Sequence, residues 1–272
     1  MPTQEEKGRA FRALHERDHA FIIPNPYDIG TARILAHVGF EALASTSMGY
    51  AFTQGRPDYG LQRGDVLAHL KLLAAATDLP VSADLENGFG DDPTTVAETI
   101  AMTAATGIVG GSIEDATGRA GAPIYPLDVA VERIRAAVAA ARALPFTFTL
   151  TARCENYLHD REDLDDTIAR LRAYEEAGAD VLYAPGLETA ADITAVVKSV
   201  RKPVNVLGGF AQLSLAELSA IGVKRVSVGS SLNIAALSAF TRAAQEMKEH
   251  GTFTYAKSSV SSSQFTNIFA RR

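Results

Sequence analysis

Residues 80–110, with the sequence PVSADLENGFGDDPTTVAETIAMTAATGIVG, contain one repeating unit of the fold that we predict for this chain. A short apolar run from Pro80 predicts a buried β-strand, and Pro93 stands where a helix typically begins. Apolar residues at helical spacing continue to Gly107, where a left-handed glycine would end the helix before the next strand at Gly110. A strand, a helix and a second strand in this order predict a βαβ unit of a parallel sheet.

The same alternation recurs along the chain. Eight candidate strands begin near Ala20, Glu41, Pro80, Gly110, Phe146, Val181, Pro203 and Arg225. Glycines precede several of them, as in Val38-Gly39-Phe40, Thr106-Gly107-Ile108, Ala177-Gly178-Ala179 and Ile221-Gly222-Val223. The pattern and the length of 272 residues, close to the ~250 of one α/β barrel, predict a single (β/α)8 TIM-barrel domain over residues 1–272. A doubly wound sheet remains the alternative, although no glycine-rich phosphate-binding motif follows the first strand.

Two further helices are predicted outside the repeats. Residues 3–17 form a pattern that would close the bottom of the barrel, and residues 231–250 form one helix before Gly251. The tail, residues 251–272, carries apolar residues at helical spacing: Phe265, Ile268 and Phe269. Such a turn either packs on a partner surface or belongs to a frayed terminus.

Composition narrows the functional class. The formal net charge is -6 and no cluster of Lys and Arg is evident, which argues against a nucleic-acid surface. The only cysteine, Cys154, cannot form an internal disulfide, and we expect a packed, inert thiol. No signal peptide or long apolar window is present, so we expect a cytoplasmic protein without membrane partners. His37 and His69 fall in helical patterns and are predicted to lie on helix surfaces.

Acidic residues end two neighbouring strands. Asp84 and Glu86 close the third predicted strand, and Glu114 and Asp115 close the fourth. Carboxylates at adjacent strand ends repel each other unless a cation or a shared proton compensates. They therefore predict a hard, oxygen-ligated metal, Mg²⁺ with Mn²⁺ as the alternative. The remaining possibility is that Asp84 or Glu114 caps a helix or pairs with a nearby arginine, Arg119 or Arg153.

Anion-binding groups are predicted at the same edge of the sheet. Arg153 ends the fifth strand, and its planar guanidinium suits a carboxylate or a phosphonate. A salt bridge from Arg153 to Glu155 or Glu114 is the alternative. Ser45-Thr46-Ser47-Met48-Gly49, at the end of the second strand, offers hydroxyl and backbone N–H donors to an anion.

These motifs together resemble the isocitrate lyase / phosphoenolpyruvate mutase superfamily. The resemblance runs through Asn25-Pro26-Tyr27-Asp28, Asp58, the segment 82–90, Ile113-Glu114-Asp115, Thr151-Ala152-Arg153 and the segment 176–180. It implies a (β/α)8 barrel that forms a homo-oligomer, a dimer or a tetramer, with the C-terminal helix exchanged between subunits. The tail would then pack on a neighbouring subunit.

The resemblance also implies roles for individual residues. Asp84 would bind the metal directly, and Asp58, Glu86 and Glu114 would hold metal-bound waters. Glu86 departs from the common Asp-x-Asp pattern, so its longer side chain would shift a water or reach the metal. Substrate binding would fall to Thr46, Ser47, Met48, Arg153 and Asn205, and the catalytic group would comprise Arg153, Glu114 and Asp58.

The loop at residues 116–125 departs most from the family pattern. It contains neither the cysteine nor the histidine of the lyase loop, and Tyr125 is the remaining candidate proton donor besides water. We therefore predict a Mg²⁺-dependent lyase that cleaves a C–C bond of a 2-oxo or 2-hydroxy di- or tricarboxylate through a stabilised enolate. The alternatives are P–C bond chemistry, as in a phosphonopyruvate hydrolase or phosphonomutase, and a non-catalytic 2-oxo-acid binding protein.

Overall fold

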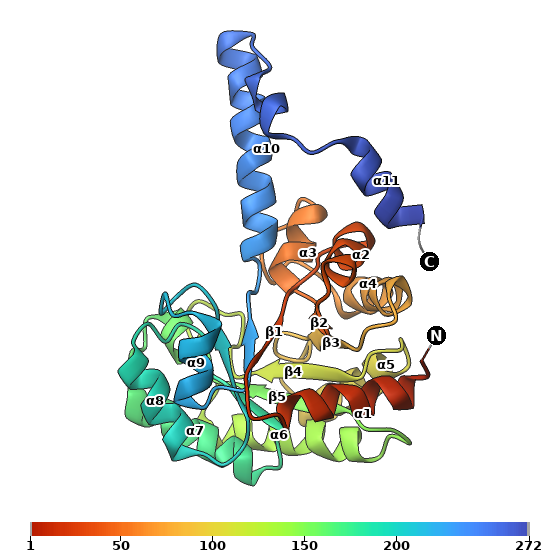
Figure 1. The fold of residues 1–272 in the computed structure, drawn as a ribbon. Coiled ribbons are helices and arrows are strands. Elements are labelled where there is room, and N and C mark those ends of the chain that lie inside the picture. The colour runs from red at the N-terminus through yellow and green to blue at the C-terminus, as the bar shows by residue number, and fades with distance from the viewer. Residues whose placement is uncertain (1, 271–272) are drawn as a thin grey trace.

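Eight parallel strands form the central sheet in the computed structural model, which describes residues 2–270 (Figure 1). The strands are β1 (Phe21–Ile23), β2 (Leu43–Ala44), β3 (Val81–Asp84), β4 (Gly110–Glu114), β5 (Thr149–Arg153), β6 (Val181–Tyr183), β7 (Val204–Leu207) and β8 (Arg225–Ser227). Strand β1 pairs with β8, and the backbone N–H of Ala44 donates to Pro24 O at 3.1 Å between the ends of β1 and β2. The predicted TIM barrel is confirmed, and the doubly wound alternative is wrong because its first and last strands would not pair.

Helices follow the strands in the predicted alternation. They are α1 (Gln4–His15), α2 (Ile29–Val38), α3 (Ser47–Thr53), α4 (Arg63–Ala76), α5 (Pro93–Ala104), α6 (Leu127–Arg142), α7 (Leu164–Glu176), α8 (Ala190–Ser199), α9 (Leu215–Ile221), α10 (Ser231–His250) and α11 (Ser262–Ala270), with 3-10 turns at Asn156–His159 and Thr254–Ser258. Pro93 is the first residue of α5, after the N-cap Asp92. Gly39, Gly107, Gly178 and Gly222 all adopt the left-handed conformation, as predicted from their places before the strands.

Helix α1 closes the bottom of the barrel, as predicted. Thr3 and Glu6 form a capping box that starts the helix. Gly8 lies so close to the start of β5 that an added Cβ would stand 2.3 Å from the carbonyl oxygen of Thr147. Phe11 is completely buried in a small core cluster with Phe21 and Ile23. A side chain larger than hydrogen at position 8 would therefore push α1 off the barrel.

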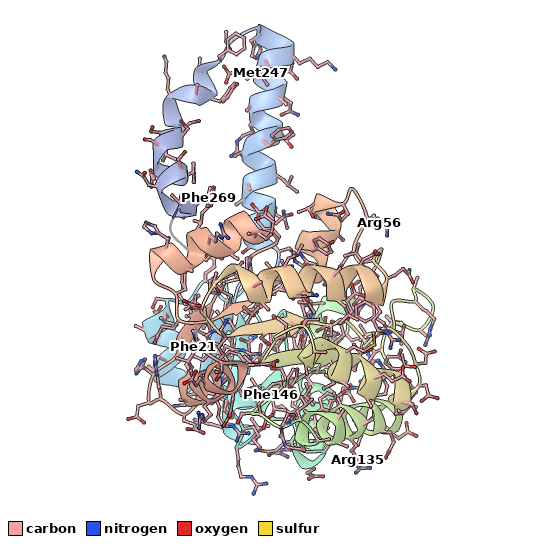
Figure 2. The ribbon with its side chains drawn as sticks, turned by 90° about the vertical axis from the view of Figure 1, so that its right-hand side faces the viewer. Phe21, Arg56, Arg135, Phe146, Met247 and Phe269 are labelled. Carbon is pink, nitrogen blue, oxygen red and sulfur yellow. The ribbon has the colours of Figure 1, made fainter. Side chains whose placement is uncertain are left out.

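The C-terminal segment leaves the barrel and returns to it. Helix α10 projects outward, with Met247 near its far end, and α11 comes back toward α2 (Figures 1 and 2). Ile268 of α11 is buried, whereas Phe240 of α10 is 73% exposed. The helical, packed α11 argues against a frayed tail, and its exchange with a neighbouring subunit stays a prediction.

Two expectations about single residues have different outcomes. Cys154 is buried as a free thiol whose pKa burial raises, so the packed thiol is confirmed and its inertness stays a prediction. His69 was expected on a helix surface, but that prediction is wrong: it is 5% exposed, and its ring stacks on Tyr50 with 3.7 Å between centroids. The helical period of α4 does not reveal that α3 covers this face. His37 is exposed.

No helix within residues 2–270 combines the length and the apolar character needed to cross a bilayer.

Candidate active site

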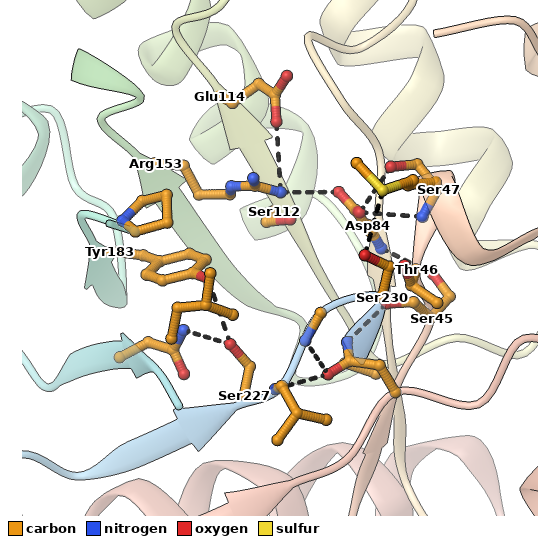
Figure 3. Close-up of a pocket in the computed structure, with 18 of the residues that line it drawn as sticks. Ser45, Thr46, Ser47, Asp84, Ser112, Glu114, Arg153, Tyr183, Ser227 and Ser230 are labelled. Atoms are coloured by element: carbon orange, nitrogen blue, oxygen red, sulfur yellow. Dashed lines mark hydrogen bonds and ion pairs between the residues drawn. The ribbon is translucent and has the colours of Figure 1, made fainter. Parts of the chain in front are cut away.

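A cavity of about 520 Å³ lies at the carboxyl ends of the strands. Its walls include most of the predicted site residues, namely Thr46, Ser47, Met48, Asp58, Asp84, Glu114, Arg153 and Asn205. Figure 3 labels Thr46, Ser47, Asp84, Glu114 and Arg153 among them. Residues at this end of a barrel converge from different strands because all the strands are parallel. The cavity is therefore the place where sequence-distant polar groups meet.

Asp84, the last residue of β3, is held by three donors. Its Oδ2 accepts hydrogen bonds from the backbone N–H of Ser47 at 3.0 Å and from Ser47 Oγ at 2.8 Å. Its Oδ1 lies 2.9 Å from Arg153 Nη1. The backbone N–H of Asp84 donates to Ser45 Oγ at 2.8 Å. These contacts fix the carboxylate against β2 on one side and β5 on the other.

Arg153 connects acids at the carboxyl ends of β3, β4 and β5. The same Nη1 lies 3.3 Å from Glu114 Oε2, and Nε donates to Glu155 Oε1 at 2.9 Å. Burial alone would lower the pKa of Arg153, but Glu155, Glu114 and Asp84 raise it well above its usual range. The predicted salt-bridge alternative for Arg153 is therefore present in this structure. Figure 3 shows its guanidinium between Asp84 and Glu114.

Tyr59 and Glu155 also belong to the site: the sequence predicts Glu155 only as an alternative partner of Arg153 and gives no sign of Tyr59. The hydroxyl of Tyr59 donates to Glu114, and both Tyr59 and Glu155 line the cavity. Tyr59 has a left-handed backbone with φ of 56° and follows Asp58 directly. That conformation in a non-glycine residue accompanies functional sites, but no local sequence pattern predicts it.

The acidic groups carry more negative charge than Arg153 can offset. Burial, followed by repulsion from Asp84 and Asp58, raises the pKa of Glu86 to about 8. Burial and Asp84 raise the pKa of Asp58 as well. For Glu114, burial is the largest cause of a strongly raised pKa, and Glu155 and Asp84 add to it while Arg153 opposes it. Such mutual repulsion among carboxylates is the condition that a bound cation relieves.

Glu86 is placed differently from the other acids. Its backbone φ is 48°, and its side chain is 5% exposed without a hydrogen-bond partner among residues 2–270. It is also absent from the cavity wall. Its backbone carbonyl accepts from the N–H of Glu114 at 3.0 Å. A buried carboxylate held without a donor next to Asp84 fits a group that faces a cation or its water.

These donors suit a hard divalent cation in number and type. Asp58, Asp84, Glu86 and Glu114 offer carboxylate oxygens only, which is the donor set of Mg²⁺ and Mn²⁺. Within residues 2–270, no three acidic, histidine or cysteine side chains already stand in the mutual geometry of a formed metal site. Both carboxylate oxygens of Asp84 instead accept hydrogen bonds from Ser47 and Arg153. Metal binding would require Asp84 to exchange at least one of these contacts.

The segment after β2 lies against the cavity as predicted. Thr46 caps α3 through its side-chain oxygen, which accepts from the backbone N–H of Gly49 at 3.2 Å. Met48 Sδ accepts from Ser230 Oγ at 3.1 Å. Asn25 supports the segment by donating from Nδ2 to Ser45 O at 2.9 Å. These contacts hold the backbone of the segment in place at the cavity wall.

The base of the cavity holds a chain of neutral donors and one arginine. Asn205 Nδ2 donates to Ser227 Oγ at 2.9 Å, and Ser227 Oγ lies 3.4 Å from Tyr183 OH. Arg225 Nε donates to Asn205 Oδ1 at 2.9 Å, and Arg225 Nη2 donates to Thr151 Oγ1 at 3.0 Å. Asn205 was predicted to bind substrate, whereas Arg225 was noted only as a strand start.

Tyr125 does not face the cavity, so its proposed role as a substitute proton donor is wrong. Its hydroxyl donates to Asp91 at 2.5 Å and accepts from Asn87 Nδ2 at 3.2 Å. The guanidinium of Arg133 lies over its ring at 4.2 Å from the centroid. Tyr125 therefore ties the loop at 116–125 to the loop after β3, because the ring packs under Arg133 rather than over the barrel.

Comparisons with known proteins identify the family of this chain. A family model described as phosphoenolpyruvate phosphomutase matches residues 11–248. A solved structure from Burkholderia cenocepacia J2315, described only in general terms as a lyase/mutase, is 64% identical, covers 98% of this chain and 96% of its own, and superposes with a TM-score of 0.96. A probable 2-methylisocitrate lyase of Corynebacterium glutamicum is 30% identical over 256 residues, 90% of this chain and 82% of its own.

A structure of oxaloacetate acetylhydrolase in complex with the product oxalate is 26% identical, with a TM-score of 0.85 over 97% of this chain and 94% of its own. These relatives are a lyase/mutase, a probable 2-methylisocitrate lyase and an oxaloacetate acetylhydrolase, which supports a lyase-type reaction. The chain belongs to the phosphoenolpyruvate phosphomutase family, within the superfamily of isocitrate lyases and phosphoenolpyruvate mutases.

Proposed function

We propose that this protein is a Mg²⁺-dependent lyase that cleaves a carbon–carbon bond of a 2-oxo or 2-hydroxy dicarboxylate, an oxaloacetate-like or substituted-malate-like acid. The observation that carries the proposal is the convergence of Asp58, Asp84 and Glu114 around Arg153 in a cavity at the strand ends. The oxalate product of the oxaloacetate acetylhydrolase relative agrees with a small dicarboxylate at such a site.

The residues present divide the work of binding and holding the substrate. Asp84, supported by Asp58, Glu86 and Glu114, would hold the metal, which would supply Lewis acidity toward negative charge on the substrate, an effect worth several kcal/mol. Ser47 offers a backbone N–H and a hydroxyl, both now directed at Asp84, to a substrate carboxylate. Arg153 keeps the acids at fixed separation and presents its remaining N–H groups to the substrate.

A panel of substrates tests the proposal. Oxaloacetate, substituted malates, methylisocitrate and phosphonopyruvate would each be incubated with the protein and Mg²⁺, with assays for pyruvate, glyoxylate and oxalate. We expect turnover of a dicarboxylate that depends on Mg²⁺ and is abolished by EDTA. Turnover confined to phosphonopyruvate would transfer the assignment to P–C chemistry. Metal-dependent stabilisation by a 2-oxo acid without product over hours would identify a binding protein.

A further inference from the structure

The cavity is electrostatically divided. All the carboxylates on its wall, Asp58, Asp84, Glu114 and Glu155, come from the β2, β3, β4 and β5 side. The part contributed by β6, β7 and β8 contains neutral side chains and a single charged one, Arg225. A ligand that binds a cation among the acids therefore extends toward a wall without negative charge.

Arg225 is buried without a counter-ion. It is 5% exposed, and among residues 2–270 no carboxylate stands within ion-pair distance of it or perturbs its pKa. Burial, opposed by Tyr183 and reinforced by the charge of Arg153, lowers the pKa of Arg225 to about 10, so the side chain stays charged at neutral pH. Burying a guanidinium that has only neutral partners costs desolvation free energy, which a bound anion would offset.

The neutral partners hold Arg225 in one orientation. Its three contacts are Asn205 Oδ1 at 2.9 Å, Thr151 Oγ1 at 3.0 Å and His15 Nε2 at 3.4 Å. His15 Nδ1 lies 2.9 Å from the carbonyl oxygen of Phe11, which can only accept, so Nδ1 carries the proton and Nε2 accepts from Arg225. Three of the five N–H groups of the guanidinium are thereby used, so its plane is held in a fixed orientation before a ligand binds.

Arg153 differs from Arg225 in this respect. Its guanidinium is already neutralised by Asp84, Glu114 and Glu155 at 2.9 to 3.3 Å. An arginine surrounded by three carboxylates adds little attraction for a fourth carboxylate. Of the two arginines on the cavity wall, Arg225 is therefore the one whose positive charge is not neutralised by the protein. The volume of about 520 Å³ leaves room for a ligand longer than a two-carbon acid.

We propose that Arg225, with Asn205 and Ser227, forms an anion subsite at the base of the cavity that receives the distal carboxylate of the substrate. This inference rests on the proposed function and deepens it: the substrate carries two separated anionic groups, one at the acidic metal-binding side and one at Arg225. The subsite selects dicarboxylates over 2-oxo monocarboxylates.

Two binding probes separate the halves of the cavity. Oxalate, with two carbons, occupies only the acidic side with Mg²⁺, whereas 3,3-difluorooxaloacetate adds a distal carboxylate. Titration calorimetry of both probes with the Mg²⁺-loaded full chain measures how much the residues at the bottom of the cavity contribute to binding affinity. A reference ligand, 3,3-difluoropyruvate, lacks only the distal carboxylate. We expect wild-type protein to bind 3,3-difluorooxaloacetate at least about tenfold more tightly than this reference.

Asn205→Asp is the sharpest variant because it is nearly isosteric and supplies Arg225 with a carboxylate partner. We expect it to weaken binding of 3,3-difluorooxaloacetate at least about tenfold, to leave oxalate within about twofold and to preserve the melting temperature. Arg225→Lys should weaken the binding of 3,3-difluorooxaloacetate less than Asn205→Asp does. Asn267→Asp, which adds the same charge on exposed α11, should bind both probes like wild type.

The binding results distinguish a substrate subsite at Arg225 from a purely structural arginine. Equal losses for oxalate and the four-carbon probe in Asn205→Asp, or no loss at all, would show that Arg225 only supports the barrel. Wild-type binding of oxalate with no preference for the distal carboxylate would overturn the subsite and leave the lyase proposal standing. Failure of wild type to bind oxalate in Mg²⁺ would instead count against the proposed function itself.

Discussion

Asp84 Oδ1 and Arg153 Nη1 lie 2.9 Å apart, so the acid that ends β3 and the arginine that ends β5 restrain each other across the intervening strand β4. The side chains are 18% and 14% exposed, which places the pair at the cavity wall rather than in bulk solvent. The two partners make opposite demands on a metal, because Asp84 would bind it and Arg153 would repel it.

Asp84→Asn should abolish Mg²⁺-dependent turnover and the rise in melting temperature on adding Mg²⁺, because an amide cannot supply the charge that competes with water for the ion. The fold should persist, since the Ser47 donors can still reach the amide oxygen. Thermal unfolding with and without Mg²⁺ provides the measurement. Glu98→Gln, which removes the charge of an exposed acid paired only with Arg63, is the control. Normal Mg²⁺ activation of Asp84→Asn would remove Asp84 from the metal site.

Arg153→Lys should lower kcat/KM by about 10²-fold, because an ammonium cannot contact Asp84, Glu114 and Glu155 in one plane. Steady-state kinetics on the substrate found in the panel measures the loss. The matched control is Arg119→Lys, whose pair with Asp91 at 2.8 Å is exposed. If both variants retain wild-type kinetics, the planar fork of Arg153 has no part in the reaction.

His69→Phe should make the free energy of unfolding depend less on pH under acidic conditions. Burial lowers the pKa of His69 to about 4, below the roughly 6.5 of an unfolded chain. The unfolded state therefore binds more protons between these values, and stability is complete above pH ~6.5 and declines by up to about 1.4 kcal/mol per pH unit as the pH falls toward 4.

Phenylalanine keeps the stack on Tyr50 and removes the buried Nε2, which has no partner among residues 2–270. Denaturant unfolding from pH 4 to pH 8 should show a smaller slope in His69→Phe. Some slope remains because burial also lowers the pKa of His15, to about 3. His37→Gln, at an exposed helix position, should behave like wild type. An unaltered slope in His69→Phe would mean that His69 does not titrate in this range.

Much of the architecture could be predicted because its signals are local. Gly39, Gly107, Gly178 and Gly222 each mark a left-handed helix end, and the pattern of α10 matches its observed bounds. The acids at 84, 86 and 114 stand out for the same reason. The resemblance predicts Asn205 as a substrate-binding residue, but the contacts of Arg225 could not be predicted, because Arg225, Asn205 and Thr151 meet only when β8, β7 and β5 close around the barrel axis.

Isocitrate and methylisocitrate should be poor substrates in spite of the similarity to a 2-methylisocitrate lyase. The loop at 116–125 contains no cysteine or histidine, and Tyr125 points at Asp91. A positioned proton donor contributes about 10² to 10⁴ in rate, so turnover should be weak. Glyoxylate release measures it. Values of kcat/KM near 10⁴ M⁻¹s⁻¹, typical of competent enzymes, would mean that another group protonates the product.

Truncation after Gly251 should reduce stability and oligomer size. It removes the buried Ile268, a side chain whose burial is worth roughly 1.5–3 kcal/mol, together with Phe265 and Phe269. Sedimentation velocity and thermal unfolding give the two readouts. Ile268→Ala separates packing on α2 from subunit contacts, because it leaves the rest of α11 in place. A truncated chain with wild-type assembly and stability would contradict a packed tail.

Helix α1 has a kinetic consequence. Because Gly8 and Phe11 press it against the lower end of the barrel, the cavity is approached from the carboxyl ends of the strands. The proposed bond cleavage there would make two products that share one exit. The fragment nearer the exit would depart before the one held at the proposed subsite, so the closed floor of the barrel would impose an order on product release.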